Sequence, residues 1–147
     1  MHLTVDVNFI DLFKGQQPLP ISFKHPSAKA TTGTMAVPSG HIEVLVKGSP
    51  HAVVDFRHVD HNHNVSYAMN ESSNTGHALR TLNAVHQTVR RHMAQNPDLT
   101  HLHFYAANED PSRIKAYHAL ARRIDPEYQL AKEDRAHHFL IKGPKTP

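Results

Sequence analysis

The chain has 147 residues, a length typical of one domain, and 39% of them are apolar, enough for a single buried core. It has no cysteine, which excludes disulfide scaffolds, thiolate metal sites and cysteine nucleophiles, and no apolar run reaches the roughly 20 residues of a membrane-spanning helix. The net charge of +3 divides into −1 over residues 1–76 and +4 over residues 77–147, which suits an anionic ligand but is too weak to indicate nucleic acid.

The first 40 residues contain one regular pattern and then become irregular. Apolar residues alternate with polar ones from Leu3 to Phe9, which predicts a strand, and we expect one helical turn over Ile10–Lys14. Because no basic segment precedes an apolar one, no secretory signal is expected and a cytoplasmic location is the default. Residues 16–40 hold four prolines and predict a loop with a short extended piece around Ile21–Phe23.

Three strand candidates follow in quick succession, and short polar segments separate them. They are His41–Lys47, Ala52–Val59 and Asn64–Asn70. The separating segments, residues 48–50 and 60–63, are rich in turn-forming residues. Short polar turns between β-branched runs predict an antiparallel meander.

The periodicity changes after this meander. Apolar residues recur at steps of three or four from Ala78 to Met93, which is typical of one face of an amphipathic helix. Asn96-Pro97-Asp98 is expected to end this helix, and the compact apolar segment Leu99–Ala106 predicts a strand directly after it.

A second helix and a final strand complete the order. Asp110 followed by Pro111 is a typical helix start, and an apolar stripe over Ile114–Ile124 gives this helix its buried face. The run Phe139–Ile141 indicates a strand near the C-terminus, alone or with one more strand. A meander followed by helix, strand, helix and strand predicts one α+β or α/β domain with a mixed sheet.

A polar loop joins the third meander strand to the first helix, and it reads Glu71-Ser72-Ser73-Asn74-Thr75-Gly76-His77-Ala78. Amides at a helix N-terminus lack intrahelical partners and, with the positive end of the helix dipole, suit phosphate oxygens. Gly76 removes the side chain that would keep a ligand from the backbone. The same residues also suit a plain helix cap.

In the order and spacing of its motifs, the chain resembles the GCN5-related N-acetyltransferase (GNAT) family. The phosphate loop of that family reads Gln/Arg-x-x-Gly-x-Gly/Ala. Here Ser73-Asn74-Thr75-Gly76-His77-Ala78 has the glycine and the small residue in register. The later positions that match the family are Asn108, Ile114, Tyr117 and Leu120. The resemblance covers about residues 41–142 and looks closest to small GNAT-like bacteriophage proteins.

The resemblance implies that the chain binds acetyl-coenzyme A (acetyl-CoA) as co-substrate and transfers the acetyl group directly to a primary amine. The end of the strand Asn64–Asn70 would pair with the pantetheine arm, and the strands carrying Asn70 and Leu102 would splay to admit it. No metal is implied. The cofactor-binding residues that it implies are Ser73, Asn74, Thr75, Gly76, His77, Ala78 and Asn108.

Two proton transfers in such a reaction need side chains. Tyr117 falls where the family has its general acid, and its phenol can donate a proton to the departing sulfur. Tyr117 could also be an ordinary core aromatic on the apolar stripe of its helix. Glu71 is the candidate base, or the carboxylate that orients a water acting as base. It could equally be a solvent-exposed loop residue that contributes to helix capping. Asn108 would contact the pantetheine arm or shape the loop before Asp110.

Two departures from the family pattern lead to a second hypothesis. Ser73 lacks the long polar side chain of the family's loop, and residues 11–40 are proline-broken where the family has two helices that wall the acceptor site. The chain could therefore be a catalytically inactive GNAT-like protein, of phage origin, that binds and modulates a host protein in the host cytoplasm. Homodimers are common in the family, but no stripe here identifies an interface.

Fifteen histidines stand out in the composition. Imidazoles beside a carboxylate suit Zn²⁺ or Ni²⁺, but a hairpin tip rarely supports a fixed site, so a solvated turn is expected for the most metal-like group. That group is His58, Asp60, His61 and His63. His101 and His103 share one face of a strand, near the cofactor cleft or partly buried. The basic residues of the helices lie mostly opposite the apolar stripes, so nucleic acid is not expected.

Overall fold

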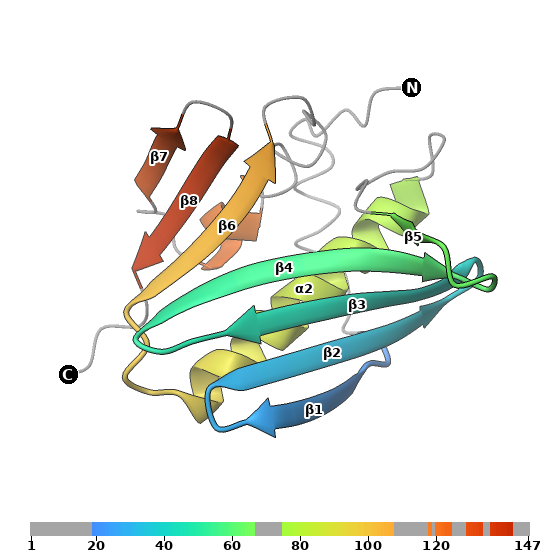
Figure 1. Ribbon diagram of the computed structural model, residues 1–147, viewed down its shortest axis with the longest axis horizontal. Coiled ribbons are helices and arrows are strands. Elements are labelled where there is room, and N and C mark those ends of the chain that lie inside the picture. The colour runs from blue at the N-terminus through green and yellow to red at the C-terminus, as the bar shows by residue number, and fades with distance from the viewer. Residues whose placement is uncertain are drawn as a thin grey trace.

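One mixed β-sheet with a long helix against one face organises the protein (Figure 1). The computed structural model describes residues 19–66, 75–107, 118, 120–124, 129–133 and 136–142. The elements are β1 (Ser22–Ser27), β2 (Ala30–Val37), β3 (Gly40–Lys47), β4 (His51–Asp60), β5 (Val65–Ser66), α2 (Thr75–Gln95), β6 (His101–Ala107), β7 (Gln129–Glu133) and β8 (Ala136–Lys142).

The strand order combines an antiparallel meander with one parallel neighbour. The sheet runs β1-β2-β3-β4-β6-β8-β7, and β5 pairs with β4 off this path. Each of these pairs is antiparallel except β4 with β6, which is parallel. These pairings confirm a mixed sheet in an α+β arrangement.

Alternation along the strands decides which face is buried. In β3, Ile42, Val44 and Val46 are buried toward α2, whereas Glu43 and Leu45 lie on the opposite face. Among the described residues no helix covers that opposite face, which we call the open face; it turns toward the viewer in Figure 1. The period of two therefore separates a helix-covered core from an exposed, mostly polar surface.

The first part of the sheet differs from the prediction of a loop over residues 16–40. That prediction is wrong for β1 and β2, although the extended piece expected around Ile21–Phe23 does fall at the start of β1. The prolines do not break the strands, because Pro26 lies in the edge strand β1 and Pro38 in the turn after β2. Gly33 also weakens the strand signal of β2, for a packing reason given below.

The other predicted elements agree more closely with the structure. The strands expected over His41–Lys47 and Ala52–Val59 are β3 and β4, and the later ones are β6 and β8, with β7 as the additional strand. Of the candidate Asn64–Asn70, Val65–Ser66 is a strand, and residues 67–70 lie outside the described residues. Leu120 and Ala121 belong to a helical segment buried in the common core, whereas its predicted start at residues 110–111 lies outside the described residues.

Helix α2 packs its apolar stripe on the sheet as expected. Leu82, Val85 and Val89 are fully buried against the strands. The helix ends before Pro97, where the Asn96 side chain donates to the His92 carbonyl at 3.0 Å and so satisfies a carbonyl of the last turn. Among the described residues no helix is both long enough and apolar enough to span a membrane.

A fully buried histidine fixes α2 along the sheet. His92 Nε2 lies 2.8 Å from the Gly48 carbonyl, which can only accept, so Nε2 carries the proton. His92 Nδ1 then accepts from the Thr31 hydroxyl at 3.0 Å. Both ring nitrogens are satisfied without solvent, and the C-terminal end of α2 is held beside the turn between β3 and β4.

Close packing between α2 and β2 depends on a missing side chain. A methyl group at Gly33 would overlap Thr88 Oγ1 and lie 3.0 Å from Ile21 Cδ1. Thr88 cannot easily turn away, since it is fully buried and donates to the Ala84 carbonyl at 2.8 Å. Glycine is therefore needed here for close approach rather than for a special backbone angle.

We predict that Gly33→Ala destabilises the protein by about 1–3 kcal/mol through overpacking against Thr88. Urea unfolding measures the loss. In the double variant Gly33→Ala/Thr88→Ala the loss should be smaller than the sum of the two single losses, because Thr88→Ala removes the overlapping atom. Strictly additive losses would show that the two residues do not limit each other.

Candidate functional site

The most distinctive feature of the sheet is the short parallel pairing of β4 with β6. It joins His51–Val54 to His101–Phe104, although β4 continues to Asp60 and β6 to Ala107. Beyond Phe104, β6 remains paired with β8, and beyond Val54, β4 remains paired with β3. The two strands diverge in Figure 1, and β5 pairs with the end of β4 at His58 and Val59. We call the region between β4 and β6, from Val54 to β5, the β4–β6 opening.

The first turn of α2 lies at the same end of the sheet as this opening. His92, near the C-terminus of α2, contacts Gly48 just before β4 begins, and Thr88 packs on Gly33 farther along the sheet. The helix therefore runs antiparallel to β4, and its N-terminus lies toward the C-terminal end of β4 (Figure 1). The backbone of Thr75–Ala78 forms this first turn, whose amides have no intrahelical carbonyl to bind.

A helix N-terminus and the edge of a strand are both places at which proteins bind ligands. Helix-terminal amides and the positive end of the helix dipole favour phosphate oxygens. An extended, amide-bearing arm can hydrogen-bond the edge of a strand, as an added strand does. The two features lie at one end of the sheet, so one ligand could use both.

The structure pairs β6 with an earlier strand than expected, and residues 67–70 of the expected strand lie outside the described residues. We expected the strand carrying Asn70 to splay from the strand carrying Leu102, but the parallel neighbour of β6 is β4. The chain turns back after Asp60, and β5 pairs antiparallel with β4 at His58 and Val59. The chain therefore forms a hairpin of β4 and β5 before it reaches α2. The strand that pairs with β6 is the first strand of this hairpin, β4, rather than the segment just before α2.

The predicted site residues are only partly within the described residues. Thr75, Gly76, His77 and Ala78 lie in the first turn of α2, as the phosphate-loop prediction requires of their backbone. The remaining predicted residues fall outside the described residues, and their roles stay predictions. They are Glu71, Ser73, Asn74, Asn108 and Tyr117.

The side chains of the metal-like group, at the end of β4 and in the turn after it, form hydrogen bonds with neighbouring residues. Asp60 accepts from the backbone amides of Asn62 and Asn64 at 2.8 and 2.9 Å, and these hydrogen bonds, chiefly with Asn64, lower the pKa of its carboxyl group. His58 Nε2 lies 2.9 Å from the Ser39 hydroxyl, and His61 Nε2 lies 3.0 Å from the Pro38 carbonyl. Within the described ranges, no group of three or more histidines and carboxylates is arranged to hold a metal.

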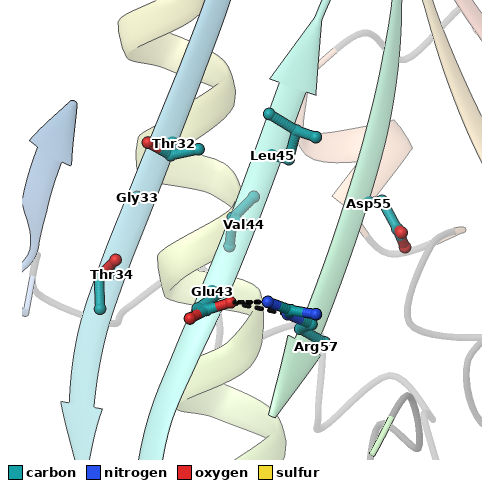
Figure 2. A pocket seen from close by; sticks show the side chains of 8 residues that line it. All are labelled: Thr32, Gly33, Thr34, Glu43, Val44, Leu45, Asp55 and Arg57. Atoms are coloured by element: carbon teal, nitrogen blue, oxygen red, sulfur yellow. Dashed lines mark hydrogen bonds and ion pairs between the residues drawn. The ribbon is translucent and has the colours of Figure 1, made fainter. Parts of the chain in front are cut away.

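A hollow of about 450 Å³ lies on the open face, over β2, β3 and β4 (Figure 2). Its charged part is a cross-strand pair, in which Arg57 binds Glu43 Oε1 at 2.7 Å and His41 contacts Glu43 Oε2 at 2.9 Å. Although partial burial opposes it, these hydrogen bonds hold the pKa of Glu43 below its ordinary value. Sequence analysis missed this hollow, because strand pairing alone brings Glu43 opposite Arg57.

One histidine of α2 has a strongly altered protonation equilibrium. Burial, together with the nearby charges of Arg90 and Arg123, lowers the pKa of His86 from 6.5 to about 4. The Nε of Arg90 also donates to His86 Nε2 at 3.4 Å, which requires an unprotonated nitrogen. His86 is therefore neutral in the folded protein at neutral pH.

We predict that His86 makes the protein less stable as the pH falls from about 6.5 to 4. Over this range the unfolded chain protonates His86 while the folded chain does not, so protons favour unfolding. Urea unfolding at pH 7 and at pH 4.5 gives the loss of unfolding free energy over this range. The loss should be smaller in His86→Gln than in the parent protein, by on the order of 2 kcal/mol. Equal losses in the two proteins would contradict the assignment.

Comparison of the chain with protein-family models, with curated proteins and with solved structures gives no match. No relative therefore supplies a function. The features that bear on function are the β4–β6 opening and the first turn of α2.

Proposed function

We propose that the protein is an acetyl-CoA-dependent N-acetyltransferase of the GNAT type, which transfers the acetyl group to a primary amine. The observation that carries this proposal is the parallel pairing of β4 with β6, which stops at Val54 and Phe104 while both strands continue. The first turn of α2 lies at that end of the sheet. A thioester ligand with a phosphorylated end and an extended amide arm fits both features.

The order of elements supports the same proposal. An antiparallel meander leads through α2 to a parallel strand, then through a helical segment to two antiparallel strands. This order supports the meander–helix–strand–helix–strand arrangement that the sequence resemblance implies for the family. The resemblance rests on the loop at residues 73–78 and on the positions around Tyr117, so sequence and topology support one proposal independently.

In the proposed complex the pyrophosphate lies on the first turn of α2. Amides of Thr75–Ala78 donate to its oxygens, and Gly76 allows the close approach. The pantetheine arm extends from there toward the point where β4 and β6 pair. The thioester then lies near Val54 and Phe104, where the strands separate.

The reaction needs one bond to form and one to break. The neutral amine attacks the thioester carbonyl, the new C–N bond forms, and the C–S bond breaks to release the coenzyme A thiolate. Glu71, directly or through a water, takes the proton that the amine loses, and the Tyr117 phenol donates a proton to the thiolate. These two assignments derive from the resemblance.

The first test is calorimetric titration of the chelator-treated protein with acetyl-CoA. We expect one site per chain with micromolar affinity, and we expect Gly76→Leu to abolish binding because its side chain blocks access to the amides. Leucine is a better helix former than glycine, so α2 should persist. Ala94→Leu, at an exposed position near the other end of α2, is the matched control and should bind as the parent does.

The second test separates catalysis from binding. Tyr117→Phe should lower turnover of an amine acceptor by about 100-fold or more, because the general acid is lost, while acetyl-CoA affinity changes by less than about twofold. Release of the coenzyme thiol can be followed without background, since the protein has no cysteine. Tyr128→Phe, outside the matched positions, is the control.

The outcomes distinguish the two hypotheses. Unchanged turnover in Tyr117→Phe would remove the assigned general acid but not the fold or the cofactor site. No acetyl-CoA binding up to millimolar concentration would contradict the enzyme proposal and favour the inactive GNAT-like protein that engages a host protein.

A further inference from the structure

Three histidines gather on the open face where β4 and β6 are still paired. The parallel register sets His51 directly opposite His101, and their rings stack with centroids 4.4 Å apart and planes 6° apart. His103 lies two residues farther along β6, on the same face, and its Nε2 is 3.2 Å from His51 Nδ1. Two imidazole nitrogens from different strands therefore face each other at short range.

The separation of these two nitrogens matches that of two ligands on one metal ion. Nitrogens bound at 2.0–2.1 Å lie about 3.3 Å apart in tetrahedral geometry and about 2.9 Å apart at a right angle. The observed 3.2 Å lies between these values. Imidazole nitrogen is a preferred ligand of Zn²⁺, Ni²⁺ and Cu²⁺.

The surrounding strands fix the backbone positions of both histidines before any ion binds. His51 and His103 lie within the paired segments of β4 and β6, and His103 is also paired with Leu140 of β8. His101 stacks on the His51 ring, and its own Nδ1 lies 2.9 Å from the Thr100 hydroxyl. Little reorganisation is therefore needed to form a chelate, which favours affinity.

We propose that His51 and His103 chelate one divalent transition-metal ion of the zinc class, through His51 Nδ1 and His103 Nε2. Water completes the coordination shell, because His51 is exposed on the open face. The ion links β4 to β6 beside the β4–β6 opening and so connects the two parts of the sheet. This site is separate from the proposed acetyl-CoA site, which uses the first turn of α2.

The test uses ZnCl₂ alone as the probe, with the full chain. Calorimetry should find one tight ion per chain in the parent protein, and His51→Gln/His103→Gln should weaken that binding at least about tenfold. The matched control His61→Gln/His63→Asn also removes two exposed histidines, at the turn after β4, and should bind as the parent does. The positive φ of His63, 66°, is one that asparagine tolerates.

Nitrogen-15 NMR of the imidazoles identifies the ligand atoms. On addition of Zn²⁺, the resonances of His51 Nδ1 and His103 Nε2 should shift together, at one equivalent of metal. If the His51/His103 variant keeps parental Zn²⁺ affinity, or if the shifts appear only at other histidines, the pair is a hydrogen bond alone and the proposal is wrong. Matching thermal unfolding of variant and parent without metal verifies that the fold is retained.

Discussion

Buried contacts with the sheet fix the position of α2, and this position determines where the helix N-terminus lies. His92, fully buried, joins the helix to the Gly48 carbonyl and to the Thr31 hydroxyl, and Gly33 lets Thr88 pack directly on β2. A buried polar group costs several kcal/mol if it loses its partners, so sliding or reversing the helix is strongly disfavoured. The N-terminus of α2 is therefore held at the end of the sheet where β4 and β6 have separated.

The opening itself follows from pairing on both sides of it. β4 stays bound to β3 along nearly its whole length, and β6 stays bound to β8, so each strand follows its own neighbour after the four shared positions. Sheet twist then carries the two strands apart. The N-terminus of α2 and the end of β4 therefore lie at the same end of the sheet.

Local patterns predicted much of the fold. Alternation identified β3 and β4, and the three-to-four spacing from Ala78 to Met93 identified α2, because these signals depend only on which face is buried. β2 was missed, since Gly33 is required by packing against Thr88, and a contact between residues 55 positions apart has no local signature. The partner of β6 could not be predicted for the same reason.

Some parts of the candidate site also have a local sequence signal, whereas others depend on contacts between distant residues. The start of α2 at Thr75 could be predicted from local sequence, whereas the phosphate-binding role of this first turn stays a prediction. The strand that borders the opening, the Glu43–Arg57 pair and the His51–His103 pair all depend on register between distant segments. Pairing of strands, rather than residue type, creates these three features.

Amide hydrogen exchange with and without acetyl-CoA tests the central claim most directly. The account predicts slower exchange in the first turn of α2, at Thr75–Ala78, and along β4 beyond Val54, with β1 and β2 unchanged. If saturating acetyl-CoA protects β2 and β3 instead, or protects neither predicted segment, the β4–β6 opening is not the ligand site and the proposed function is contradicted.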